Sequence, residues 1–255
     1  MSAFWLALSF LTRLPVPARF AVTPASTGQS VLYYPLVGLL IGILLVSARA
    51  ALADHPSLGP ALVLALWVAI TGALHLDGLA DCADAWIGGQ GDRERTLRIM
   101  KDPRSGPAAI ATLITVLLIK YGALAELGAA VPAALLWAPV LGRGAVAFWL
   151  LNLPYVRARG LGRDLVEHLP RRGAVAVLAL TTVLAGITLG PLLMVWTACM
   201  AWGLGAITRR RLGGCTGDTL GAGVELMEIA VLACSVLIEG LARTANPGRS
   251  PARGP

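Results

Sequence analysis

Long apolar runs separated by short polar segments dominate the hydropathy pattern of this 255-residue chain. A helix of about 20 apolar residues is long enough to cross the ~30 Å hydrocarbon core of a membrane. The pattern therefore predicts an all-α, polytopic integral membrane helix bundle with about seven transmembrane helices. The predicted spans cover residues 31–53, 60–76, 107–124, 132–151, 174–190, 192–207 and 222–242.

The two ends of the chain differ from these spans. About eleven apolar-rich residues precede Arg13, which is too few to cross a membrane, so we expect a short N-terminal interfacial helix stopped by Pro15 and Pro17. The tail, residues 246–255, is rich in proline, glycine and arginine and is predicted to be disordered. We find no linker or repeat, and we expect a single membrane-embedded catalytic domain over residues 1–245.

Composition supports a membrane protein. The chain is 56% hydrophobic and only 14% charged, whereas soluble domains are about 25% charged. Its net charge of +7 does not indicate a nucleic-acid partner, because basic loops orient membrane helices and contact membrane lipid. The four cysteines form no CxxC pair and have no histidines at zinc spacing, so neither a disulfide nor zinc is expected.

The basic residues gather on one side of the predicted bundle. Seven crossings place the N-terminal segment and the loops 77–106, 152–173 and 208–221 together, with 15 of the 21 Lys and Arg residues. The positive-inside rule makes this face cytoplasmic. Eleven of the fourteen acids lie there too, which favours one site facing water. Tail arginines on the opposite side conflict with this topology, unless the last helix dips into the membrane without crossing it.

The stretch HLDGLADCADAW is the most informative polar segment. Asp77, Asp81 and Asp84 occupy positions i, i+4 and i+7, so on a helix they share one face with neighbouring Cβ atoms about 5–6 Å apart. Three such carboxylates repel one another and need a cation, and hard oxygen ligands beside a diphosphate favour Mg²⁺. His75, just before them, is a candidate to orient an aspartate or to donate to phosphate.

A second acidic segment, GGCTGDTLGAGVELME, holds Asp218 and Glu225 seven residues apart. They share a face of a helix that we expect to begin near Thr219, with Asp218 as its N-cap. We predict that both join Asp77, Asp81 and Asp84 as metal ligands. Gly217 and its neighbouring glycines permit a tight turn whose N–H groups suit a phosphate oxygen.

Basic side chains supply candidate phosphate contacts. The loop DRERTLRIMKDPRSGP contains Arg98, Lys101 and Arg104, and such groups bind phosphate oxygens. Arg143 lies instead within an apolar run, where an arginine costs at least ~2.5–3.5 kcal/mol near a helix centre. A partner or a polar cavity is therefore expected beside Arg143, which we include among the candidate substrate-binding residues.

These residues together predict a reaction class. The carboxylates and basic loop suit Mg²⁺-dependent chemistry on a diphosphate at a membrane surface, with cations stabilising the charge that develops at phosphorus. One aspartate beyond those that the metal needs would accept the proton of an incoming hydroxyl. The candidate catalytic residues are Asp77, Asp81, Asp84 and Asp218, and the residues alone do not assign their individual roles.

The chain resembles the CobS (cobalamin synthase) family in five stretches: FLTRLPVP at 10–17, YYPLVGLLIG at 33–42, LHLDGLADCADAW at 74–86, RIMKDPRSGP at 98–107 and GGCTGDTLGAGVELME at 213–228. The resemblance implies a bacterial or archaeal enzyme of the cytoplasmic (inner) membrane that requires Mg²⁺. It implies that adenosylcobinamide-GDP is joined to α-ribazole or its 5′-phosphate, giving adenosylcobalamin or its 5′-phosphate and GMP, late in cobalamin biosynthesis. A homo-oligomer or association with other cobalamin-assembly enzymes is compatible with it.

Three other functions compete with this interpretation. A membrane prenyltransferase would use two aspartate-rich motifs, but the second segment here has one Asp and a distant Glu. A CDP-alcohol phosphotransferase also displaces a nucleoside monophosphate, yet its fuller run of aspartates is missing. A transporter would account for Arg143, but the hydropathy shows no twofold repeat.

Overall fold

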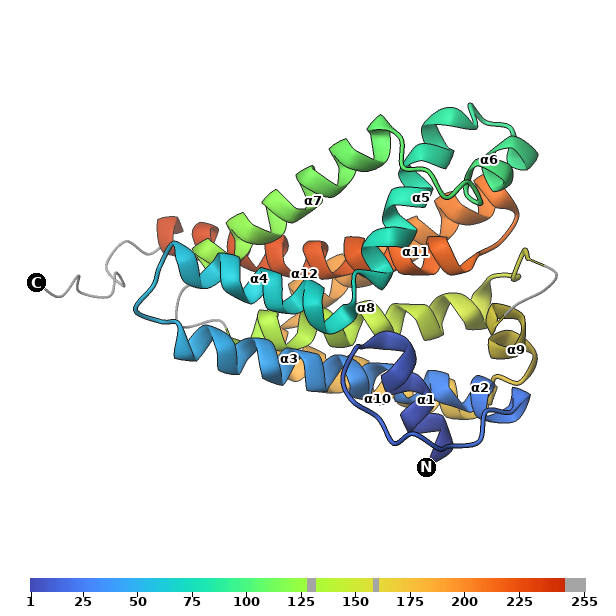
Figure 1. Cartoon of the computed structure of the whole chain (residues 1–255). Coiled ribbons are helices and arrows are strands. Elements are labelled where there is room, and N and C mark those ends of the chain that lie inside the picture. Colours follow the sequence, from blue (N-terminus) through green and yellow to red (C-terminus); the bar gives the residue numbers. More distant parts are fainter. Residues whose placement is uncertain (128–131, 158–160, 246–255) are drawn as a thin grey trace, which may run out of the picture.

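In the computed structural model, the described residues 1–127, 132–157 and 161–245 fold as helices joined by short connections (Figure 1). No strand forms among them, and one isolated parallel bridge joins Tyr155 to Cys215. The predicted disordered tail, residues 246–255, lies outside the described residues. The elements are α1 (Ser2–Leu11), α2 (Pro24–Ser30), η1 (Val31–Tyr33), α3 (Tyr34–Ala51), α4 (Leu58–Thr71), α5 (Leu74–Gly88), α6 (Arg93–Ile99), α7 (Pro107–Glu126), α8 (Pro132–Asn152), α9 (Leu161–Glu167), α10 (Arg171–Leu189), α11 (Pro191–Leu212) and α12 (Gly217–Ala245).

The helices confirm the predicted class, a polytopic membrane bundle. Within the described part of the chain, six helical segments are long and apolar enough to cross a membrane, and α4 with α5 form a bent pair that would be a seventh. The short helix α1 ends at Leu11, ahead of Pro15, as the sequence predicts. Helix α12 is continuous, so it does not remove the conflict with the tail arginines. The six segments are Pro24–Ala51, Pro107–Glu126, Pro132–Asn152, Arg171–Leu189, Pro191–Leu212 and Gly217–Ala242.

The predicted span 60–76 is wrong in one respect, because it is not continuous. Helix α4 ends at Thr71, and α5 leaves it at an angle of 89°. Gly72 (φ +59°) and Ala73 (φ +57°) both adopt the left-handed conformation, which stops a right-handed helix. The backbone N–H of Arg13 donates to the carbonyl of Ile70 at 2.7 Å, so the segment after α1 is tied to this break. The aspartates therefore lie on a separate helix, α5.

Helices α8 and α12 form the centre of the bundle. Of the α8 span, 78% is buried, whereas α10 and α11 bury only 17% each and expose their apolar side chains outward. Helix α3 approaches α8 closely, because a Cβ on Gly42 would lie 2.4 Å from the carbonyl oxygen of Leu136. Helix α12 packs along α5 on one side and α8 on the other. This arrangement holds the start of α12 against the acidic helix.

The polar connections meet at one end of the bundle, near α5, α6 and α9 in Figure 1. Arg93 Nε donates to the carbonyl of Leu212 at 2.7 Å, which joins the connection after α5 to the end of α11. The N–H of Val156 donates to the carbonyl of Cys215 at 2.9 Å, which joins the connection after α8 to the one before α12. The prediction that these three loops lie together is therefore confirmed for their described residues.

Candidate active site

Helix α5 carries the three aspartates on one face, as the sequence predicts. Asp77, Asp81 and Asp84 fall within an arc of roughly 60° at 100° per residue. Gly78 lets the backbone of α12 approach α5, since a Cβ there would lie 2.8 Å from the carbonyl oxygen of Asp218. The close approach brings the start of α12 beside the aspartates of α5. We call Asp77, Asp81 and Asp218 the acidic cluster.

Helix α12 begins at Gly217, two residues earlier than the sequence predicts, and a pair of threonines caps it. The N–H of Thr219 donates to Oγ1 of Thr216 at 3.2 Å, and the N–H of Thr216 donates to Oγ1 of Thr219 at 2.8 Å. This reciprocal pair satisfies the helix end. The predicted N-cap role of Asp218 is therefore wrong, and its carboxylate instead forms an ion pair with Arg157.

A cavity of about 290 Å³ lies where α5 and α12 meet the segment that follows α8. Its polar lining brings together four residues predicted from the sequence and two that were not. His75 is only 4% exposed, and its Nδ1 has no hydrogen-bond partner among the described residues. The four predicted residues are His75, Asp77, Gly217 and Asp218, and the two others are Tyr155 and Arg157.

The acidic cluster has excess negative charge. Asp81 lies within electrostatic range of Asp77, Asp84 and Asp218, and Arg157 is the cation that opposes them. No hydrogen bond or ion pair reaches the side chains of Asp77 or Asp81 within the described ranges. Like charges this close favour binding of a further cation. Unpaired carboxylate oxygens are the ligands that Mg²⁺ prefers, so the donor chemistry of the cluster fits this ion.

Asp84 has a different environment from its neighbours on α5. Its carboxylate accepts hydrogen bonds from the N–H groups of Gly106, at 2.5 Å, and of Ala109, at 2.9 Å. Gly106 is the N-cap residue of α7 and Ala109 lies in its first turn, where N–H groups have no partner inside the helix. Asp84 therefore caps α7 and fixes it to α5, and both of its oxygens are engaged.

Glu225 lies in a buried ion-pair network, away from the acidic cluster. Lys120 Nζ lies 2.6 Å from carboxylate oxygens of both Glu225 and Glu228, and Arg143 Nη1 lies 2.8 Å from Glu228. None of these four side chains is more than 5% exposed. We call Lys120, Arg143, Glu225 and Glu228 the buried quartet. The two acids of the quartet are neutralised by Lys120 from α7 and Arg143 from α8. Glu225 therefore pairs with a lysine, whereas the sequence predicted a metal ion as its partner.

Arg143 has the buried partner that its position required, but it lines none of the described cavities. Its Nη1 also donates to the carbonyl of Pro139 at 3.1 Å. An arginine that is 0% exposed cannot contact a substrate without rearrangement of the bundle. Arg143 is therefore packed inside the bundle against Glu228, and it does not line the cavity beside the acidic cluster.

The predicted phosphate-binding residues Arg98, Lys101 and Arg104 are exposed at the polar end and do not line the cavity. Arg104 donates from Nε and Nη2 to the two carboxylate oxygens of Asp102, at 3.0 and 2.8 Å. These hydrogen bonds lower the pKa of Asp102 to about 2. Arg104 is therefore partly neutralised by its neighbour, while Arg98 and Lys101 remain available as exposed cations.

Sequence reasoning missed Arg157 and Tyr155, which follow α8 directly. Their signal was a polar Tyr-x-Arg group immediately after the fourth apolar run. Burial raises the pKa of the Tyr155 hydroxyl, so Tyr155 is neutral and available as a hydrogen-bond donor. Burial likewise raises the pKa of the nearby Cys215 thiol to about 11, so this thiol is protonated near pH 7. The sequence also signalled Lys120, a lone cation within the third apolar run.

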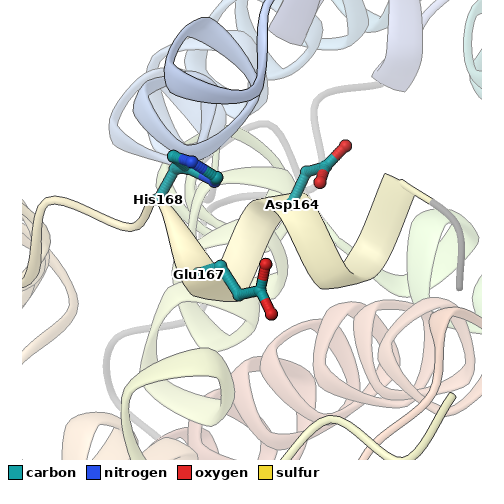
Figure 2. A group of neighbouring side chains, drawn as sticks. All are labelled: Asp164, Glu167 and His168. Carbon is teal, nitrogen blue, oxygen red and sulfur yellow. The ribbon is translucent and has the colours of Figure 1, made fainter. Parts of the chain in front are cut away.

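A group of metal-ligating side chains lies on α9 (Figure 2). Asp164, Glu167 and His168 place one ligand atom each within 4.8 Å of the others. Among the described residues no other three His, Cys, Asp or Glu side chains meet this criterion, so the acidic cluster is not a preassembled three-ligand cage. Glu167 forms an ion pair with Arg163 at 2.6 Å, which reduces its capacity for a cation.

A second cavity, of about 330 Å³, is apolar and lies on the other side of α5. Leu79, Cys82 and Trp86 line it, and these positions are on the face of the helix opposite Asp77 and Asp81. Tryptophan and leucine side chains dominate its wall, with no acid among them. None of the three acids of the acidic cluster therefore lines this cavity.

A polytopic helical bundle that gathers carboxylates from two helices far apart in the sequence at one polar end is the architecture of a membrane-embedded enzyme. The family model described as CobS, cobalamin-5-phosphate synthase, matches residues 3–236. The chain belongs to this family, and it is thus a transferase of cobalamin biosynthesis.

Curated relatives match the chain over nearly their whole length. A protein from Pseudomonas putida is 54% identical over 234 residues, which is 91% of this chain and 97% of the relative. A protein from Pseudomonas savastanoi pv. phaseolicola is 51% identical over 244 residues, covering 93% and 100%. Both are named adenosylcobinamide-GDP ribazoletransferase. No solved structure matches the chain.

Proposed function

We propose that the chain is an adenosylcobinamide-GDP ribazoletransferase of the cytoplasmic membrane, with Mg²⁺ as its cofactor and its acidic cluster facing the cytoplasm. The observation that carries the proposal is the convergence of Asp77, Asp81 and Asp218 with excess negative charge beside a cavity. The names of relatives at 54% and 51% identity support the substrates. The basic residues around this end of the bundle support the cytoplasmic orientation.

In the proposed reaction, a ribose hydroxyl of α-ribazole, or of its 5′-phosphate, attacks the cobinamide-side phosphorus of adenosylcobinamide-GDP. A new P–O bond forms, the bond to the bridging oxygen breaks, and GMP leaves with that electron pair. The attacking hydroxyl gives up its proton to a carboxylate of the acidic cluster. The products are adenosylcobalamin, or its 5′-phosphate, and GMP.

Asp77, Asp81 and Asp218 would hold Mg²⁺, which usually takes one or two protein carboxylates and completes its shell with water and phosphate oxygens. The bound ion would neutralise the diphosphate and stabilise the leaving group. A preassembled cage of three ligands is unnecessary for such a site. Asp84 and Glu225 have other partners in the structure, so we do not assign them to the metal.

The other cavity residues would position the phosphates. Arg157 and the N–H groups at the start of α12 near Gly217 offer donors for phosphate oxygens on one wall. His75, with its unpaired Nδ1, and the neutral hydroxyl of Tyr155 offer two further hydrogen bonds. Arg98 and Lys101, exposed beyond the cavity, would attract the anionic substrate to this end of the bundle.

The size of the cavity limits what it can enclose. About 290 Å³ is at the lower limit of ligand pockets, which typically measure ~300–1,000 Å³. A corrinoid linked to a nucleotide is far larger than such a pocket. We therefore propose that the corrinoid ring stays outside the cavity and that only the diphosphate region reaches the acidic cluster.

The direct test uses purified full-length protein in detergent with adenosylcobinamide-GDP, α-ribazole and Mg²⁺. We expect GMP and a corrinoid product in equal amounts, and we expect both to disappear with EDTA and to return with added Mg²⁺. Absence of both products with Mg²⁺ present would overturn the activity. Undiminished turnover in EDTA would overturn the metal requirement alone.

Orientation is tested separately by cysteine labelling in intact cells. The control position Asp54 lies in the turn between α3 and α4, at the end opposite the acidic cluster (Figure 1). We expect Asp54→Cys to react with an impermeant maleimide in the periplasm, and Arg104→Cys to react only after the membrane is permeabilised. The reverse pattern would overturn the cytoplasmic assignment.

A further inference from the structure

A groove on the outside of the bundle lies between the end of α8 and the part of α10 from Arg171 to Val183. It has a volume of about 840 Å³ and is separate from the acidic cluster and its cavity. The surrounding face is exposed, since only 17% of the α10 span is buried inside the protein. The groove is lined by Leu151, Asn152, Arg171, Arg172, Val175, Leu178, Ala179, Thr182 and Val183.

The groove changes character along α10. Arg171 and Arg172 form its polar end, and apolar side chains such as Val175 and Leu178 form the rest of its wall. Arg171 Nη2 donates to the carbonyl of Leu151 at 2.7 Å, so this guanidinium is fixed to the end of α8. No acid lines the groove, and no ion pair to Arg171 or Arg172 occurs among the described residues. An anion is thus the missing partner.

Helix stability does not explain these arginines. They occupy the first two positions of α10, where the helix dipole favours negative charge and disfavours cations. Helix α10 is one of the segments long and apolar enough to cross a membrane, so we expect the lipid headgroups to lie near its first residues. Two unpaired cations at this depth therefore match the phosphate of an anionic lipid.

The length of the groove matches one leaflet of a membrane. Arg172 and Val183 are eleven positions apart, which corresponds to about 16 Å along a helix. Half of the ~30 Å hydrocarbon core is about 15 Å. An acyl chain lying against Val175, Leu178 and Val183 would therefore run from the headgroup region to the middle of the bilayer.

We propose that this groove is a specific binding site for an anionic phospholipid of the membrane. Its phosphate group pairs with Arg171 and Arg172, and one acyl chain fills the apolar part of the groove. The bound lipid would hold together the two ends of the segment 153–170, which connects α8 to α10 and carries Tyr155 and Arg157. The lipid site stands on its own and does not rest on the proposed enzymatic activity.

The test measures lipid retained by full-length protein from mixed micelles of phosphatidylglycerol and phosphatidylcholine, using native mass spectrometry. A basic residue near the membrane surface strengthens binding of anionic lipid about fivefold. The double variant Arg171→Gln/Arg172→Gln is therefore expected to bind phosphatidylglycerol about 25-fold more weakly. The matched control Arg209→Gln/Arg210→Gln removes two exposed arginines at the end of α11, outside the groove, and is expected to bind like the wild type.

A second variant fills the apolar part of the groove without changing charge. Ala179→Trp lies in the lining and is exposed, so we expect it to fold normally and to retain severalfold less lipid. Equal losses in both arginine double variants, or no preference of the wild type for phosphatidylglycerol, would overturn the proposal. Undiminished lipid retention by Ala179→Trp would overturn it as well, even if Arg171→Gln/Arg172→Gln failed to fold.

Discussion

Two charged groups share helix α12 but differ in charge balance. The acidic cluster at the start of α12 sets three carboxylates against Arg157, a net charge of −2. The buried quartet, two turns further along, pairs two carboxylates with two cations at 2.6–2.8 Å and is neutral. The quartet has no capacity left for another cation, whereas the cluster has free carboxylate oxygens.

The comparison distinguishes acids that stabilise the fold from acids that are available to bind a ligand. A buried ion pair is neutralised inside the bundle, and removal of one partner leaves an uncompensated charge in a medium of low dielectric constant. Carboxylates with excess negative charge near water instead repel one another, and a bound cation stabilises them. We therefore expect variants of the quartet to affect folding, and variants of the cluster to affect activity.

The largest expected effect comes from Glu228→Ala, which removes the carboxylate shared by Lys120 and Arg143. Breaking a buried ion pair in this way costs about 3–5 kcal/mol of stability. We expect little folded protein by size-exclusion chromatography, and a much lower unfolding temperature for the remainder. Glu126→Ala, at the exposed end of α7, is the control and should behave like the wild type. A loss below about 1 kcal/mol would remove the distinction between the two groups.

The next effect is on activity. Asp81→Asn removes one charge of the acidic cluster, and loss of one preorganised electrostatic contact typically lowers kcat about 10²–10³-fold. The unfolding temperature should stay the same or rise, because repulsion among the carboxylates falls. Steady-state GMP release and thermal unfolding are measured together, with Asp54→Asn, exposed at the opposite end, as the control. Full activity in Asp81→Asn would contradict the catalytic role proposed for the acidic cluster.

Gly78→Ala tests the backbone approach that builds the cluster. The new Cβ would lie 2.8 Å from the carbonyl oxygen of Asp218, so α12 must move away from α5. Such overpacking costs typically 1–3 kcal/mol, and the displaced Asp218 should lower GMP release in the folded fraction. Gly122→Ala is the matched control, because no atom beyond the adjacent residues and backbone of its own helix lies within 4 Å of the position that its new Cβ would take. Equal behaviour of the two variants would show that the close approach is unnecessary.

The smallest effect concerns an exposed pair, Asp102 with Arg104. The depressed pKa of Asp102, about 2, means that this pair contributes stability above pH ~4, the ordinary aspartate range, and loses it only as the pH falls toward 2. Between pH 5 and 8 its charge state should not change. Arg104→Gln should return the pKa of Asp102 toward ~3.9, measured by NMR of labelled aspartate carboxyls. An unchanged pKa would mean that Arg104 is not its partner in solution.

Much of the helical architecture could be predicted from hydropathy, and the misses have local causes. The predicted span 60–76 was broken by the left-handed residues Gly72 and Ala73, which carry no hydropathy signal. Asp218 suited an N-cap by residue type, but Thr216 and Thr219 satisfied the same helix end and left its carboxylate for another partner. Arg157 was one basic loop residue among many until the fold placed it beside Asp218.

By itself, the sequence determined the membrane class, the run of spanning helices and the shared face of Asp77, Asp81 and Asp84, because these depend on residue type and on the 3.6-residue period of one helix. Tertiary structure decided which acids are neutralised. Glu225 and Asp218 lie seven residues apart in one segment, yet Lys120 reaches one and Arg157 the other. Electrostatic partners are chosen by distances of a few ångströms between residues far apart in sequence, and only packing sets those distances.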